Sequence, residues 1–284
     1  RESGVEWVVG DLRDPAAIAA GVEGADVVYH LAAVTAAKTE REYEAANAAG
    51  TRSLVHALQA GRTPPPRLVY LSSYAAVGPA IDGRPRGQQD EPAPLSAYGR
   101  SKLAGERFAR EAEGNGVEVI VLRAPAVYGP GDRALLPYFR LVRSRLAPVP
   151  GGDDRRLHLI FVRDLAVALA GAAIAPGGTY AVAEPAEHLW REVVATIASV
   201  MGTRPLRLPL PPSLVRFAAA TTEGIGRLSG RAVPFNREKA EEMLAPAWIC
   251  DLANSELLLP SQAVTPLQEG IEQTVRWYIR QGWL

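Results

Sequence analysis

The chain has 284 residues, of which 48% are hydrophobic and 22% are charged, so it can bury a full core and form one large domain plus a smaller one. Its formal net charge is zero, which argues against electrostatic capture by nucleic acid or by an anionic membrane and favours small-molecule partners. A single cysteine, Cys250, no uninterrupted apolar stretch of about 18 residues and no visible signal peptide favour a cytoplasmic protein.

Apolar runs rich in β-branched residues alternate with helical segments in the first half of the chain. The second and third helices are expected over residues 40–58 and 97–112; the first, over residues 16–21, has Asp14 as its N-cap and Pro15 in its first turn. Such alternation predicts parallel pairing, right-handed crossovers and a doubly wound sheet. The expected strands, each buried on both faces, are 5–9, 26–31, 68–71 and 117–122.

The pattern changes after about residue 130. A strand over 158–162 is flanked by helices over 135–146 and 164–174, and short strands and proline-rich connectors follow from residue 177. Three more helices are expected near residues 190–201, 213–229 and 267–280. We therefore predict an α/β protein whose larger domain spans residues 1–176, with residues 133–157 contributing to the substrate side, and whose smaller α/β domain spans residues 177–284.

Two side chains in the predicted helix 97–112 suggest acid–base chemistry. Tyr98 and Lys102 are four residues apart, so they lie on one face of the helix. A neighbouring ammonium favours the phenolate, and we expect it to lower the pKa of Tyr98 from about 10 toward the working pH. Ser73 ends a buried strand, at the edge of the sheet where open α/β folds bind ligands, although a serine there can equally be a cap or a turn residue.

The strand that ends in Ser72-Ser73, the loop that ends in Val77-Gly78, and the run from Ala97 to Lys102 together resemble the extended short-chain dehydrogenase/reductases, the epimerase/dehydratase family. The resemblance implies a Rossmann-type parallel sheet, a smaller α/β substrate domain, an NAD or NADP cofactor, and a catalytic triad of Ser73, Tyr98 and Lys102. It also implies that Asn47 supports the active site. Besides Tyr98 and Lys102, the residues that it assigns to cofactor binding are Asp11, Leu12, Leu31, Ala32, Ala33, Ser72 and Pro125.

The beginning of the family pattern is not found in this sequence. Members start with a strand, a glycine-rich turn and a helix that binds the pyrophosphate, and none of these precedes Arg1. We therefore expect the first β-α-β unit, on the order of 40 residues, to be missing. The residue that separates NAD from NADP would fall in that unit, so both cofactors stay open. Glycines between 224 and 230 superficially resemble the glycine-rich turn, but no strand leads into them, and a helix end explains them better.

The histidines and Cys250 lack the spacing of metal ligands, and no Gly-x-Ser-x-Gly motif occurs, so neither a metal site nor acyl transfer is expected. The resemblance implies interconversion of a hydroxyl and a carbonyl. Nucleotide-sugar members carry an arginine that aligns with Leu157, although Arg155 and Arg156 are adjacent, and residues 214–228 form an apolar helix where a substrate lid should lie. This favours an enzyme similar to the hydroxysteroid dehydrogenases or dihydroflavonol reductases. A nucleotide-sugar epimerase or dehydratase and a non-catalytic cofactor sensor are the alternatives, and a homodimer is left open.

Overall fold

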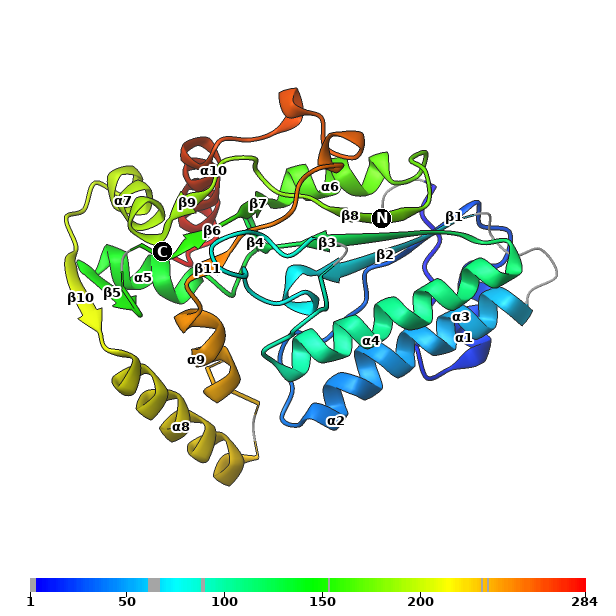
Figure 1. Ribbon diagram of the computed structural model, residues 1–284, viewed down its shortest axis with the longest axis horizontal. Helices are drawn as coiled ribbons and strands as arrows, with labels where there is room; N and C mark the ends of the chain where they lie inside the picture. Colours follow the sequence, from blue (N-terminus) through cyan, green and yellow to red (C-terminus); the bar gives the residue numbers. More distant parts are fainter. Residues whose placement is uncertain (1–3, 61–66, 88–89, 153, 231, 234) are drawn as a thin grey trace.

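Four apolar runs form a parallel sheet at the centre of the larger part of the molecule, in the order β1-β2-β3-β8 (Figure 1). The computed structural model describes residues 4–60, 67–87, 90–152, 154–230, 232–233 and 235–284. The sheet confirms the predicted Rossmann-type α/β fold. Its strands are β1 (Val27–His30), β2 (Arg67–Ser73), β3 (Glu118–Ala124) and β8 (Gly178–Ala181).

Helices cover both faces of this sheet (Figure 1). Strand side chains alternate between the faces, so Leu68 and Tyr70 pack toward the helices below the sheet in the view, whereas Val69 packs toward α6 (Val162–Gly171) on the other side. The elements below the sheet are α1 (Pro15–Val22), α2 (Glu40–Tyr43), a π-helical turn η1 (Glu44–Ala49), α3 (Gly50–Ala60), α4 (Ala97–Glu111) and the 3-10 turn η3 (Ala112–Asn115). Asp14 caps α1 as predicted, since its carboxylate accepts from the N–H groups of Ala16 and Ala17.

The smaller part of the molecule lies at the carboxyl side of the sheet (Figure 1). Its core joins β7, α5, α7 and α10 through buried side chains such as Phe139, Phe161, Ile197 and Ile271. Short strand pairs complete it: β4 with β7, β5 with β10, and β6 between β9 and β11. Its elements are β4 (Ala126–Tyr128), α5 (Leu136–Arg143), β5 (Leu146–Pro150), β6 (Arg156–Leu157), β7 (Leu159–Phe161), β9 (His188–Leu189), α7 (Trp190–Val200), β10 (Leu206–Leu210), α8 (Pro212–Ser229), α9 (Arg237–Leu244), β11 (Ala247–Trp248) and α10 (Leu267–Arg280). The 3-10 turns η4 (Ser255–Leu257) and η5 (Ser261–Ala263) lie beside α6, on the core of the larger part (Figure 1).

Three expectations about these elements need correction. Residues 5–9 form no strand and are exposed, because no described strand lies beside them to pair with their backbone groups. Residues 178–181, which we placed in the second domain, form β8 and pair with β3 in the main sheet. The helix expected to reach residue 146 ends at Arg143, because Arg145 adopts a left-handed conformation with φ of 62° and a strand starts at Leu146.

The predicted helix end around Gly230 is confirmed, since α8 closes there with a left-handed glycine. No helix in the described part of the chain is both long and apolar enough to cross a membrane.

Candidate active site at the carboxyl ends of β2 and β3

Ser73 and Tyr98 meet where β2 ends and α4 begins. Ser96 caps α4 by accepting from the N–H of Gly99 at 3.1 Å, and this cap places Tyr98 in the first helical turn. Gly99 permits close contact with the turn after Ser73, because a β-carbon there would lie 2.4 Å from the carbonyl oxygen of Ala75. The structure thus brings the hydroxyl of Ser73 near the phenol of Tyr98, where it favours the phenolate.

The pKa of Tyr98 is raised, whereas the sequence led us to expect that Lys102 would lower it. Burial is the main cause, since a desolvated phenolate is disfavoured, and the hydroxyl of Ser73 opposes this effect. The carboxylate of Glu242 and the phenol of Tyr43 raise the pKa further. In this structure the hydroxyl of Ser73, not Lys102, is therefore the group that favours the phenolate.

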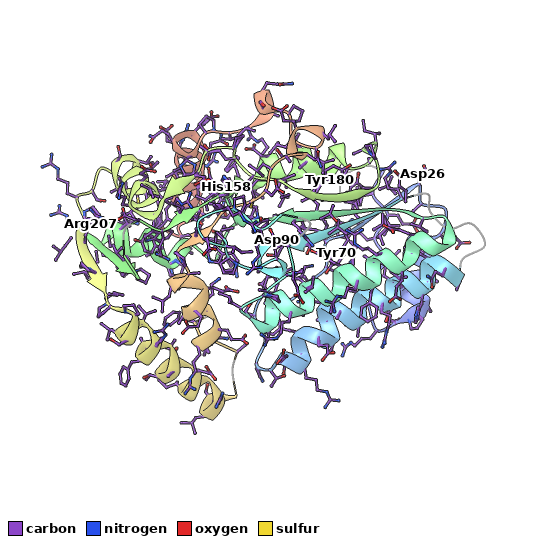
Figure 2. The ribbon with its side chains drawn as sticks, viewed as in Figure 1. Asp26, Tyr70, Asp90, His158, Tyr180 and Arg207 are labelled. Carbon is purple, nitrogen blue, oxygen red and sulfur yellow. The ribbon has the colours of Figure 1, made fainter. Side chains whose placement is uncertain are left out.

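Lys102 lies one turn beyond Tyr98 on α4, with only 2% of its surface exposed. Its ammonium donates to the carbonyl of Leu71 at 2.7 Å and lies 4.3 Å from the ring centroid of Tyr70, which sits between the sheet and α4 (Figure 2). Burial lowers the pKa of Lys102 to about 8, and the charge of Glu106 opposes this shift. The ammonium is therefore held in a dry environment that destabilises its charged form.

Asn47 lies in the π-helical turn η1 and is buried, with 1% of its surface exposed. Its amide oxygen accepts from the N–H of Val34 at 2.8 Å, and its amide nitrogen donates to the carbonyl of Val34 at 3.0 Å and to the hydroxyl of Ser101 at 2.9 Å. Ser101 donates in turn to the carbonyl of Tyr98. The asparagine thus joins the loop after β1 to the first turn of α4, which holds Tyr98.

A buried ion pair that the sequence analysis missed lies beneath these residues. Arg123 of β3 binds Glu106 of α4 through two contacts of 2.7 and 3.0 Å, and Ser72 donates to the same carboxylate at 2.6 Å. Ser72 and Arg123 are direct neighbours in the register of β2 and β3. The signal was present in the sequence, because Tyr98, Lys102 and Glu106 follow one another at intervals of four on one helical face.

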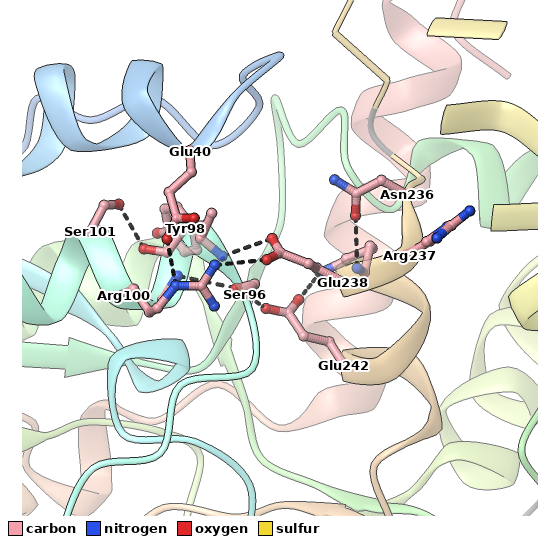
Figure 3. Close-up of polar contacts among 12 residues, drawn as sticks. Glu40, Ser96, Tyr98, Arg100, Ser101, Asn236, Arg237, Glu238 and Glu242 are labelled. Carbon is pink, nitrogen blue, oxygen red and sulfur yellow. Dashed lines mark hydrogen bonds and ion pairs between the residues drawn. The ribbon is translucent and has the colours of Figure 1, made fainter. Parts of the chain in front are cut away.

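Acidic side chains of α9 reach the start of α4 from the smaller part of the molecule (Figure 3). Glu238 accepts from the N–H of Ala97 at 2.7 Å and pairs with Arg100, which also pairs with Glu40 of α2. Ser96 donates to Glu242 at 2.5 Å. These contacts, also absent from our sequence predictions, tie α2, α4 and α9 together around Tyr98.

The positions expected to hold the cofactor lie along the same edge of the sheet, with differing exposure. Leu31, Ala32 and Ala33 are exposed directly after β1. The short side chains of the two alanines leave the backbone open to a large ligand, so this turn fits a dinucleotide. Pro125 follows β3 and is half-buried.

The remaining expected cofactor positions have protein partners. Asp11 is exposed and binds Arg13 through two contacts of 2.8 Å, and these hydrogen bonds lower the pKa of Asp11 to about 2. Leu12 packs into the core beside Gly50, and the buried hydroxyl of Ser72 points to Glu106 rather than into the cleft. The side chains of Leu12 and Ser72 are therefore both engaged within the protein. The described residues contain no group of three or more His, Cys, Asp or Glu side chains that could hold a metal ion.

Comparison with known proteins shows the family to which the chain belongs. The model of the NAD dependent epimerase/dehydratase family matches residues 1–183. The chain is 32% identical over 288 residues to the ceramide reductase of Caulobacter vibrioides, covering 100% of this chain and 84% of that protein. It is 28% identical over 269 residues to the 4-hydroxy-2-methyl-3-oxo-4-farnesyl-3,4-dihydroquinoline-1-oxide ketoreductase of Stigmatella aurantiaca, covering 86% of this chain and 79% of that protein.

Among solved structures, the chain is similar to the UDP-glucose 4-epimerase of Thermus thermophilus in complex with NAD. The TM-score is 0.74 at 22% identity, covering 98% of this chain and 86% of the other, which shows a shared fold. The chain belongs to the NAD dependent epimerase/dehydratase family and is an NAD-dependent oxidoreductase or epimerase of the extended short-chain dehydrogenase type.

Proposed function

We propose that this enzyme reduces a ketone, or oxidises the corresponding secondary alcohol, on a largely apolar substrate. The observation that carries the proposal is the packing of the first turn of α4, which holds Tyr98, against the turn after Ser73 at the carboxyl end of β2, with Lys102 one turn further along α4. Tyr98 gives a proton to the carbonyl oxygen or takes it from the hydroxyl, and Ser73 hydrogen-bonds the same oxygen. Leu31, Ala32 and Ala33 would hold the cofactor backbone, and Lys102 its ribose. NAD(P), when bound, supplies or accepts the hydride.

The two arginines that could bind a nucleotide diphosphate are occupied within the protein. Arg155 donates to the carbonyl of Met243 and lies over the ring of Trp190. Arg156 pairs with Glu187 at 2.9 Å and donates to the carbonyl of Gly83. Because binding a diphosphate would require breaking these contacts, their geometry favours a substrate without one.

A small apolar cavity of about 50 Å³ lies in the core of the smaller part of the molecule, beyond the carboxyl ends of β2 and β3. Its wall includes Ala126, which lies only two residues after Ala124, the register partner of Ser73. The outer side chains of the cavity are half-exposed and include Leu157 and Trp190, whereas its floor is buried. The floor consists of Tyr128, Phe139, Leu159, Val193, Ile197 and Ile271. No charged side chain lines this cavity, so its apolar lining agrees with an apolar substrate, but its volume of about 50 Å³ is too small to hold an alkyl chain or a ring system.

Helix α8 supplies the apolar segment that we expected near the substrate. Leu214, Phe217, Ile225 and Leu228 are exposed along one face of it. Helix α8 packs on α9, whose Glu238 and Glu242 contact the start of α4. The names of the two reductases described above, which refer to a ceramide and to a farnesyl-substituted ketone, agree with a lipid-like substrate.

The experiment uses the protein expressed from its complete gene, with NADH or NADPH deuterated at C4. A panel of long-chain 3-oxo compounds is compared with UDP-glucose plus NAD, and the products are identified by mass spectrometry. We expect deuterium on the new carbinol carbon and no conversion of UDP-glucose. Formation of UDP-galactose without ketone reduction would support the nucleotide-sugar alternative, and no turnover on either arm together with cofactor binding would support the sensor alternative.

A further inference from the structure

Tyr98, Lys102 and Glu106 occupy successive turns on the inner face of α4, where it packs against β2. Lys102 and Glu106 are 2% and 3% exposed. A buried lysine without a partner loses its proton readily, because the ammonium is poorly solvated. The proposed function requires the ammonium form of Lys102. The charges around Lys102 determine what fraction of it carries the proton at the working pH.

The groups that face Lys102 come from three elements. On β2 they are the carbonyl of Leu71 and the ring of Tyr70, and on β1 the group is His30. On its own helix Glu106 lies one turn further along, and Tyr98 lies one turn before it without a contact to the ammonium. Burial lowers the pKa of His30 to about 4 and raises those of Tyr70 and Tyr98, so all three are neutral at pH 7. Glu106 is therefore the charged side chain on these three elements that can stabilise the ammonium.

Glu106 does not act alone, since its carboxylate is shared. Arg123 holds it from β3 through two contacts, one of them at 2.7 Å, and Ser72 holds it from β2. The charges thus alternate in sign along this cluster. Lys102 is positive, Glu106 is negative and Arg123 is positive. Arg123 holds the carboxylate of Glu106 in position. Its own positive charge also offsets part of the stabilisation that this carboxylate gives to the ammonium of Lys102.

We infer that Glu106 and Arg123 are positioning residues that set the charge state of Lys102 in opposite directions: Glu106 keeps the ammonium protonated, and Arg123 limits that effect. This inference deepens the proposed function and rests on it for its catalytic meaning. It goes beyond a purely structural ion pair, because a structural pair stabilises the fold without any defined effect on the proton of Lys102.

The chain contains only Lys38, Lys102 and Lys239 as lysines, so the charge of Lys102 can be measured without any assay of turnover. Lysine labelled with carbon-13 at Cε gives three resonances, and Lys102→Arg identifies the one of interest. The pH titration is recorded for the wild type, expected near the pKa of about 8, and for two variants. In Glu106→Gln the Lys102 resonance should titrate at lower pH, and in Arg123→Met at higher pH.

Opposite shifts in the two variants support the inference, and shifts of the same sign or unchanged titrations in both would overturn it. If Glu106→Gln fails to fold, two other variants test the inference: Ser72→Ala, which removes one hydrogen bond from the carboxylate, and Arg123→Met. Glu106→Asp keeps the carboxylate and should restore a titration of Lys102 near that of the wild type. The alkaline limb of the kcat/KM profile should move with the resonance. If the resonance moves as expected and the enzyme turns over no ketone, the proposed function fails while the role of Glu106 stands.

Discussion

The hydroxyl of Ser73 serves both the backbone and the phenol of Tyr98. It accepts from the N–H of Ala75 at 3.2 Å, which caps the 3-10 turn η2 (Tyr74–Ala76) after β2, and it favours the phenolate of Tyr98, opposing the rise that burial causes in the pKa of this tyrosine. A serine at a strand end can be a cap or a catalytic residue. At this position the same hydroxyl serves as a cap and also acts on the tyrosine of the proposed triad. The turn that Ser73 caps is also the one against which Gly99 of α4 packs.

Replacing Ser73 should raise the pKa of Tyr98 further, because the hydroxyl that favours the phenolate is lost. In Ser73→Ala the ascending limb of kcat/KM for alcohol oxidation should therefore move to higher pH, with lower activity at neutral pH. Ser73→Thr keeps the hydroxyl and should restore the wild-type profile. A Ser73→Ala profile identical to that of the wild type would contradict this role.

Glu242 should act on Tyr98 in the opposite direction. Its carboxylate raises the pKa of Tyr98, and it accepts a hydrogen bond from Ser96, which a glutamine can also accept (Figure 3). In Glu242→Gln the ascending limb should move to lower pH. Glu241→Gln, which alters a pair with Arg216 on the exposed side of α9, is the matched control and should leave the profile in place. Equal profiles for all three proteins would show that α9 has no electrostatic effect on the tyrosine.

Asn47 should be important for stability as well as for activity. Replacing it with alanine removes one buried and two partly buried hydrogen bonds and leaves the N–H of Val34 without its partner, at a cost of about 2 to 3 kcal/mol. Asn236→Ala, which removes the N-cap of α9, should cost only about 1 kcal/mol. Urea denaturation of both variants measures the difference, and a smaller loss for Asn47→Ala than for Asn236→Ala would refute the assignment.

His30 should make the protein sensitive to mild acid. Its pKa is about 4 in the folded state instead of 6.5, because burial disfavours the imidazolium, and its ring bonds the hydroxyl of Thr51 at 2.9 Å. The unfolded chain therefore binds more protons between pH 6.5 and 4, and the free energy of unfolding falls as the pH drops through that window. His30 should account for about 2 kcal/mol of the loss between pH 7 and pH 5.

Denaturation of His30→Gln at both pH values measures this contribution. The variant should lose less stability than the wild type on acidification, whereas replacement of the exposed His56 by glutamine should leave the loss unchanged. An equal loss in His30→Gln and in the wild type would assign the acid sensitivity to other groups.

The parallel sheet and the position of Tyr98 could be predicted from the sequence because they depend on local patterns. Apolar runs fix the strands, and a spacing of four places Tyr98 and Lys102 on one face of α4. The cap by Asp14 was likewise predictable from adjacent residues. Residues 5–9 show the limit of this reasoning, since an apolar run becomes a strand only where a partner strand completes its hydrogen bonds.

The electrostatics of the site could not be predicted in the same way. The partner of Glu106 comes from β3, 17 positions away, and those of Ser96 and Arg100 come from α9, well over a hundred positions along the chain. Spacing along one helix also cannot show that Lys102 turns toward Leu71 and Tyr70 instead of toward the phenol of Tyr98. Such contacts depend on the packing of distant elements, and so do the pKa shifts that they cause.

The most direct test of the central claim is the rate of hydride transfer in Tyr98→Phe, measured with the protein expressed from its complete gene and a ketone that the wild type reduces. Loss of the proton donor should lower kcat/KM by a factor of about 10² to 10⁴ while the Kd of NADH or NADPH stays close to that of the wild type. Tyr180→Phe, which removes a phenol of β8 that bonds the carbonyl of Pro176, is the control and should retain its rate. Turnover of Tyr98→Phe at the wild-type rate would contradict the account.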